Sequence, residues 1–211
     1  MGYDPHVVKL PSMVRSQNKA VEMANDFYKE CIALLQSDFP NLYREDLTFN
    51  GAGSPTIELH SKTESPLNDV SAGSALVKPI GFDIPTLKEY LPASFIATPI
   101  LKKFEGTTLP AMEKMKSFLN LVNANNRQSY FIYGGFWKAD YCYPTGVQQN
   151  ALFGASTNQT MLNAPKNTKL EVDDFVFLRP HQSEFVFLQF GKILTLRDGK
   201  IVGEWELLNN N

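Results

Sequence analysis

The segment Gly51-Ala52-Gly53-Ser54-Pro55-Thr56 has the residue types that most directly suggest binding chemistry. A phosphate dianion is held best by several unblocked backbone amides, and glycine lets the chain approach it without a Cβ clash. We therefore predict a phosphate-binding loop formed by Gly51, Gly53, Ser54 and Thr56, with the two hydroxyls as spare donors. The alternative is an ordinary strand-to-loop turn, for which Gly, Ser and Pro are equally suitable.

Tyr3 and His6 are the candidate catalytic residues. They stand three positions apart in Gly2-Tyr3-Asp4-Pro5-His6, which has the composition of a loop that follows a strand. A histidine can exchange protons near neutral pH, and reactions at the Cα atom of an amino acid need such an exchange. The alternative is a chain terminus with no site around it.

The composition excludes several classes of protein. The 211 residues suffice for one or two domains, and 43% of them are apolar, which is typical of a folded core. A net charge of −2 and the lack of a long basic run argue against nucleic-acid binding. No apolar stretch approaches the ~20 residues of a membrane span, and the start lacks a signal-peptide pattern. With two cysteines, the chain is expected to be a reduced, soluble, cytoplasmic α/β protein.

The first half of the chain alternates helix and strand signals. Apolar residues recur at helical spacing between positions 14 and 35 and predict an amphipathic helix that ends before Pro40. Residues 47–49 and 69–77 predict strands, and Asp83 is placed to cap a short helix directly after it. This order of elements indicates part of a parallel α/β array.

The second half is mainly strand. Runs of β-branched and aromatic residues predict strands at 93–101, 175–178 and 185–188, and an amphipathic helix is predicted at 110–122. Two more strands, 193–196 and 201–205, flank Asp198-Gly199, a pair that favours the positive φ angles of a tight hairpin turn. The expected fold class is therefore α/β followed by β.

The α/β half looks incomplete by itself. About three strand–helix units fit into the first ninety residues, whereas a closed eight-stranded barrel takes ~250 residues. Two interpretations remain open: a small open sheet with an irregular start, or the C-terminal part of a longer protein.

Four segments, in this order, resemble the D-threonine aldolases and D-serine dehydratases. Gly2-Tyr3-Asp4-Pro5-His6 resembles a strand-end segment from the middle of their barrel, and residues 51–56 look like their phosphate loop. Asn68-Asp69-Val70-Ser71-Ala72-Gly73-Ser74 resembles the motif of their last barrel strand. Residues 172–180 are similar to the approach to their C-terminal metal motif. The order and spacing match across nearly the whole chain.

This resemblance implies an enzyme of the alanine-racemase-like group, which uses pyridoxal 5′-phosphate (PLP). Residues 1–95 would be the last strands of the PLP-binding α/β barrel, and residues 96–211 would be the C-terminal all-β domain. Tyr3 and His6 would lie over the cofactor ring, and the loop at 51–56 would hold its phosphate. The implied function is dehydratase (a lyase), aldolase or racemase chemistry on a D-amino acid, in a cytoplasmic homodimer.

The chain departs from the family at the metal motif. The family carries Pro-x-His-x-Cys or a close variant, and counting from Pro180 the matching positions are Gln182 and Glu184. Glutamine is a poor zinc ligand, Glu184 would suit a harder ion, and His181 is one residue out of register. We expect no metal site here; instead these side chains would contact the substrate or a partner subunit, or form a hydrogen-bonded strand edge.

The lysine that binds PLP in this family lies at the end of the first barrel strand, and no lysine here has that context. The chain alone is therefore expected to be inactive. It could be a non-catalytic fragment, or half of a split enzyme that needs a lysine-bearing partner. An unrelated α/β-plus-β protein is the third possibility.

Three further features have simpler interpretations. The aromatic stretch at 133–144 could wall a substrate pocket, but such clusters more often pack in a core. Cys142 has no histidine close to it in sequence and is expected to be a structural thiol. His60 belongs to no cluster of functional residues and is expected at the surface.

Overall fold

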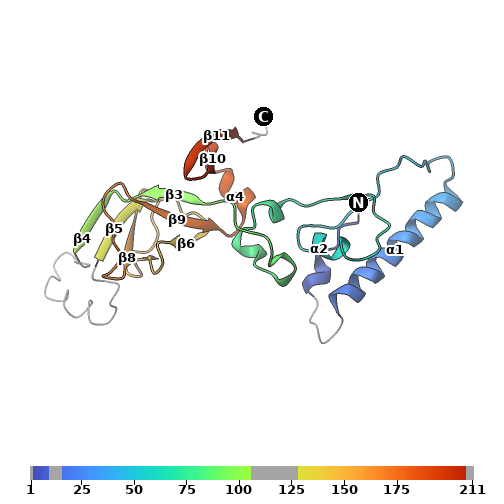
Figure 1. Cartoon of the computed structure of the whole chain (residues 1–211), viewed down its shortest axis with the longest axis horizontal. Helices are drawn as coiled ribbons and strands as arrows, with labels where there is room; N and C mark the ends of the chain where they lie inside the picture. The colour runs from blue at the N-terminus through green and yellow to red at the C-terminus, as the bar shows by residue number, and fades with distance from the viewer. Residues whose placement is uncertain (1, 10–15, 106–127, 208–211) are drawn as a thin grey trace. The chain divides into compact units, whose positions relative to one another are not determined.

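The computed structural model describes residues 2–9, 16–105 and 128–207 (Figure 1). The chain forms two compact units, Met1–Ala93 and Ser94–Asn211. Each unit has its own cluster of buried apolar residues. The helix predicted at 110–122 lies outside the described residues.

Helix α1, Gln17–Asp38, confirms the helix predicted before Pro40. Ser16 begins it, since its side-chain oxygen accepts a hydrogen bond from the Lys19 amide (3.4 Å), one of the donors that lack a partner at a helix start. The small apolar core of the first unit joins this helix to neighbouring segments through Val7, Ala20, Val21 and Leu59.

Three short parallel segments make the sheet of the first unit: residue 2, β1 (Asn50–Gly51) and β2 (Asp69–Val70). The N–H of Gly2 donates to the Asn50 carbonyl (2.8 Å), and β1 pairs with β2 on its other side. Parallel pairing is confirmed, but the strand predicted at 47–49 pairs at 50–51, and the one predicted at 69–77 ends at Val70. The Ser71 amide still donates to the Gly51 carbonyl (2.9 Å), but the chain then leaves the ladder, and the amides of Gly73 and Ala75 bond to the side chain of Ser54 in another loop.

Short helices follow each of these strands: η1 (Pro5–Lys9), α2 (Ile57–His60), η2 (Ser74–Leu76), η3 (Ile80–Phe82) and η4 (Pro85–Leu87). The prediction that Asp83 caps η4 is wrong. Ile84 occupies the cap position without a side-chain hydrogen bond, and Pro85 behind it has no N–H to be capped. The Asp83 carboxylate lies 3.9 Å from the Lys78 ammonium instead.

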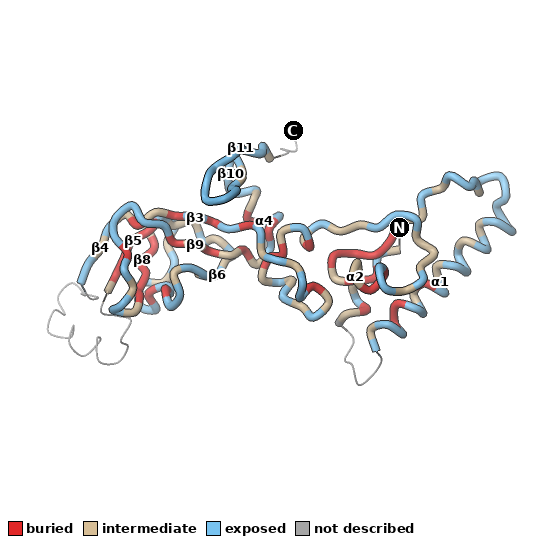
Figure 2. Tube along the Cα trace, viewed as in Figure 1, coloured by how far each residue is buried: buried red, intermediate tan, exposed pale blue. Residues whose placement is uncertain are grey.

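The second unit is built from two antiparallel sheets. One has the order β3 (Ile96–Pro99), β9 (Phe175–Pro180), β6 (Ala139–Tyr143). The other has the order β4 (Lys102–Glu105), β5 (Gln128–Tyr133), β8 (Gln159–Ala164), β7 (Gln148–Gln149). Residues of both sheets form one core, and Figure 2 shows buried positions along β5, β8 and β9. The strands predicted at 93–101 and 175–178 are confirmed.

The last part of the chain forms a hairpin of β10 (Lys192–Arg197) and β11 (Lys200–Glu206), as predicted. Asp198 and Gly199 both have positive φ, 51° and 73°, which is the geometry that the Asp-Gly pair favours. The strand predicted at 185–188 is wrong, because helix α4 (Ser183–Phe187) occupies this position. Pro180 ends β9 since it lacks a ladder donor, and Glu184 in the first turn suits a helix start.

Among the described residues, no helix has both the length and the apolar character that a membrane span requires.

The core of the second unit predicts how its stability responds to mutation. Leu162 is fully buried, so Leu162→Ala should lower the free energy of unfolding by ~2–5 kcal/mol. Leu196 is 69% exposed, and Leu196→Ala should change it by less than about 0.5 kcal/mol. Urea denaturation followed by tryptophan fluorescence measures both; equal effects would contradict this assignment of the core.

Candidate functional site

The candidate residues of the first unit lie in loops that leave one edge of its sheet. Because the three strand segments are parallel, the chain emerges at the same edge after residue 2, after β1 and after β2. In open parallel sheets this carboxyl edge is where ligands bind. The loops at residues 3–6, 52–56 and 71–76 therefore lie close together at this edge of the sheet.

Tyr3 lies against the predicted phosphate loop. A Cβ atom on Gly53 would be 3.0 Å from Cε2 of the Tyr3 ring, so the two residues are in van der Waals contact. Tyr3 is 64% exposed, which leaves it accessible to a ligand. His6 is exposed in η1, two residues beyond the buried Asp4.

Ser54 connects the loop after β1 to the loop after β2. Its hydroxyl oxygen accepts hydrogen bonds from the amides of Gly73 (3.0 Å) and Ala75 (3.1 Å). Gly53 and Ser54 are both buried, yet within the described part of the chain no hydrogen bond uses their own amides. Buried amides nearly always have a partner, so this pair of donors is suited to an anionic ligand.

The backbone of this loop leaves little room for side chains. A Cβ on Gly51 would lie 2.7 Å from Leu67 Cδ1 and 2.9 Å from the Gly2 carbonyl oxygen, which only glycine avoids. Ala52 follows with φ of 62°, a left-handed conformation that costs a residue with a Cβ roughly 1–2 kcal/mol. The loop therefore stores backbone strain beside the candidate ligand site, as functional loops often do.

A buried polar network of Asp4, Thr56 and His60 fixes the end of the predicted phosphate loop. Thr56 Oγ1 donates to Asp4 Oδ1 (2.6 Å), and His60 Nε2 donates to Asp4 Oδ2 (2.7 Å). The other ring nitrogen of His60 lies 3.2 Å from Ser65 Oγ. His60 is buried, so its predicted surface position is wrong; the prediction that the Thr56 hydroxyl is a spare donor is wrong too, because Asp4 uses it.

The Asp4 carboxyl is held in its charged form. Burial raises its pKa, but the hydrogen bonds from His60 and Thr56 and the charge interaction with His60 outweigh burial and leave the pKa below its ordinary value. The charged oxygens are thereby fixed as acceptors between the end of one strand and the loop after the next.

Sequence reasoning missed this network, although one part of it had a signal. Thr56 and His60 are four residues apart, so they share a face of the helical turn between them. Asp4 is 52 positions away from Thr56 and 56 from His60, and nothing local indicates that it joins them.

The segment after β2 also contacts the predicted phosphate loop. Thr86 Oγ1 donates to the Pro55 carbonyl (2.8 Å), and the Tyr90 hydroxyl donates to Glu58 Oε1 (2.9 Å). The bonds from Tyr90 and from Lys62 lower the pKa of Glu58. Residues 86–90 thus fix both the loop and helix α2 that follows it.

The polar residues predicted in the second unit are placed by β6 and β9. His181 Nε2 lies 2.9 Å from Asp140 Oδ1, and the Gln182 side-chain oxygen accepts a hydrogen bond from Lys138 Nζ (2.7 Å). Both follow the end of β9, and Glu184 is exposed at the start of α4. Across the described residues, no group of three or more His, Cys, Asp or Glu has an arrangement that could hold a metal ion.

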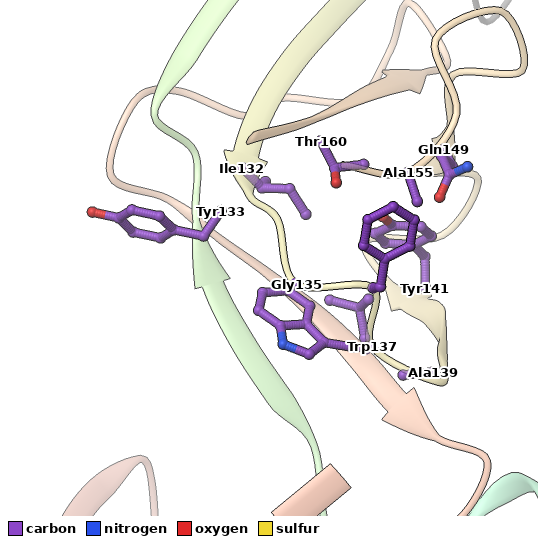
Figure 3. A pocket seen from close by; sticks show the side chains of 11 residues that line it. Ile132, Tyr133, Gly135, Trp137, Ala139, Tyr141, Gln149, Ala155 and Thr160 are labelled. Atoms are coloured by element: carbon purple, nitrogen blue, oxygen red, sulfur yellow. The ribbon is translucent and has the colours of Figure 1, made fainter. Parts of the chain in front are cut away.

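A small aromatic cavity lies in the second unit, in the stretch expected either to pack or to wall a pocket. Figure 3 shows Trp137, Tyr141 and Thr160 around it. Its volume is about 50 Å³, a fraction of the ~150 Å³ of a cavity that binds benzene, so it is too small for an amino acid. Trp137 and Tyr141 pack against the core, and burial raises the pKa of Tyr141 to about 12.

Cys142 is exposed, and its thiol donates to the Phe177 carbonyl (3.3 Å). Burial of part of the side chain is the main cause that raises the pKa of this thiol. A raised pKa lowers the thiolate fraction, which agrees with the structural role predicted for it.

Comparison with solved structures shows a likeness of fold. No protein-family model and no curated protein matches the sequence. The structure is similar to the crystal structure of D-threonine aldolase from Filomicrobium marinum, with a TM-score of 0.64 and 15% sequence identity, over 97% of this chain and 51% of that chain. The chain therefore spans about half the length of the aldolase, and it has the fold of that part. The resemblance expected from the four sequence motifs is confirmed at the level of fold.

The Asp4 network predicts a pH-dependent stability. Because the pKa of Asp4 is lowered by folding, its contribution is complete above the unfolded pKa, near 3.8, and is lost as the pH falls through the lower folded value. Asp4→Asn should lower the free energy of unfolding by roughly 1–3 kcal/mol at pH 7 and weaken its fall below about pH 4.

Urea denaturation at several pH values, followed by circular dichroism, measures this effect. Asp26→Asn is the matched control, since Asp26 is exposed on α1 and pairs with Lys29 at the surface. If both variants lose the same stability, Asp4 does not have the role described.

Proposed function

We propose that this chain holds the phosphate of PLP in an enzyme that acts on D-amino acids, by dehydratase, aldolase or racemase chemistry at Cα. One observation carries the proposal. The buried amides of Gly53 and Ser54, which no described group accepts from, lie beside the accessible Tyr3 at the carboxyl edge of a parallel sheet. The fold that contains this edge is similar to half of a D-threonine aldolase.

The residues present fit a phosphate group. The two free amides are strong donors, and Gly53 has no side chain of its own beside them. Gly51 is needed for packing, because a Cβ there would meet Leu67 and the Gly2 carbonyl. The Ser54 oxygen already accepts two hydrogen bonds, but its own proton remains available to a phosphate oxygen. Thr56 contributes indirectly, because its bond to Asp4 fixes the end of the loop.

Each remaining site residue has a proposed role in the same enzyme. When bound, PLP supplies a ring that takes up electron density as a bond to Cα breaks. Tyr3 covers the ligand beside Gly53, and the exposed His6 exchanges a proton with it. His181, Gln182 and Glu184 contact the substrate or a group of the partner subunit in a homodimer. The lysine that attaches PLP comes from a polypeptide outside these 211 residues.

A charge placed in the loop tests phosphate binding. Gly53→Asp should weaken PLP binding by roughly tenfold or more, because its carboxylate repels the phosphate and its Cβ meets the Tyr3 ring. Gly191→Asp is the control, since nothing lies within 4 Å of the Cβ position there. Equilibrium dialysis with PLP, and competition by inorganic phosphate, measures both variants. Equal affinities, or no saturable binding by the unaltered chain, would refute the proposal.

No lysine in this sequence has the context of the family's PLP-binding lysine, so we predict that the chain alone has no turnover. Purified chain with PLP should release no ammonia, pyruvate or aldehyde from D-serine or D-threonine. Borohydride reduction followed by peptide mass mapping should find no single lysine that carries the cofactor. Steady product release, or one uniquely modified lysine, would show that this chain contains its own anchor.

A further inference from the structure

Ser65 lies beside the buried pair of His60 and Asp4, and the three residues are arranged as a nucleophile, a base and a group that orients the base. Ser65 Oγ is 3.2 Å from His60 Nδ1, and His60 Nε2 is 2.7 Å from Asp4 Oδ2. The side chains of His60 and Asp4 are 4% and 8% exposed, whereas Ser65 is half-buried. In the described part of the chain, no other serine or threonine hydroxyl bonds to a histidine ring.

The charged Asp4 carboxylate decides which nitrogen of His60 carries a proton. A carboxylate only accepts hydrogen bonds, so Nε2 holds the proton and donates it to Asp4. In the neutral imidazole Nδ1 is then an acceptor, and it lies next to the Ser65 hydroxyl. A base that is oriented in this way activates the hydroxyl beside it as a nucleophile.

The chain around Ser65 is held in place by hydrogen bonds. Asn25 Nδ2 donates to the Glu64 carbonyl (3.0 Å), and the Leu67 amide donates to Ser65 Oγ (3.3 Å), which leaves the hydroxyl proton for His60. The alternative acceptor for that proton, Asn25 Oδ1, is further away at 3.4 Å. Among the described residues no hydrogen bond uses the N–H of Glu64 or of Ser65, so both donors are available to an oxyanion.

We propose that Ser65 is the nucleophile of a second active site, which transfers the acyl group of small esters. Ser65 Oγ bonds to the carbonyl carbon while its proton passes to His60 Nδ1; the ester C–O bond then breaks, and the leaving alkoxide takes that proton. Water repeats the exchange at the acyl-serine and restores the hydroxyl. Asp4 is a positioning residue that holds the imidazole. This chemistry uses no PLP and is independent of the function proposed above.

Labelling of the folded, full-length chain tests the proposal. A small fluorophosphonate should phosphonylate Ser65 with loss of fluoride, and peptide mass mapping locates the product. Ser65 should react about a hundredfold or more faster than Ser61, which is exposed and donates to the Glu58 carbonyl (2.9 Å) instead of to a histidine. Unfolding in urea should abolish this difference. p-Nitrophenyl acetate should release p-nitrophenolate, and Ser65→Ala should abolish the release.

Two variants separate activation of Ser65 from its exposure. His60→Gln removes the base and should lower the labelling rate of Ser65 about a hundredfold, with Ser61 unchanged. Asp4→Asn should lower it too. Thr56 donates to Oδ1 of residue 4, so the amide nitrogen of the asparagine would face His60, donate to Nε2 and force the ring proton onto Nδ1. Circular dichroism shows whether each variant is folded.

Each outcome decides the proposal. Labelling that is confined to Ser65 and is lost in folded His60→Gln supports it. No labelling, equal labelling of Ser61 and Ser65, or an unchanged rate at Ser65 in folded His60→Gln overturns it. If neither variant folds, the rates of Ser65 and Ser61 in the unaltered chain, with and without urea, decide alone.

Discussion

The buried carboxylate of Asp4 is the interaction on which the first unit depends. It accepts hydrogen bonds from Thr56 and His60 and so joins the end of one strand to the loop and helical turn that follow the next. A buried carboxylate without these donors would carry a large desolvation cost, so the three residues stabilise one another only as a set. With strands of only two residues, the backbone ladder is too short to fix these loops by itself. The position of the loop at residues 51–56 therefore follows from this polar network.

The sequence predicts those elements whose signal is local. Helix α1 was predicted from its helical spacing and the last hairpin from its Asp-Gly turn, and both were found within a few residues. Wrong predictions arise where a distant contact overrides the local pattern. Residues 185–187 have a strand-like composition but form a helical turn, because Pro180 ends the ladder before them. His60 is buried because Asp4, far away in sequence, provides its partner.

In the candidate site, too, features with a local signal were predicted and features that depend on distant contacts were not. Glycines and hydroxyls at 51–56 were recognisable from their types, and Tyr3 was found beside them as a candidate. The hydrogen-bond partners of these hydroxyls were not predictable from the sequence. Ser54 accepts from amides nineteen and twenty-one residues further along the chain, and Thr56 donates to Asp4. What sequence reasoning identified as ligand-binding side chains are in this structure mainly the supports that orient two backbone amides. That arrangement suits an anion, because amides fixed in advance lose little freedom when they bind it.

The most direct test is to observe these amides while PLP is added. In ¹⁵N-labelled chain, the amide resonances of Gly53 and Ser54 should shift in a saturable way, with inorganic phosphate shifting the same signals and the resonances around Trp137 unchanged. If the shifts instead cluster around the aromatic cavity of the second unit, or if no resonance responds to PLP, the loop is a structural turn and the proposed cofactor site does not exist.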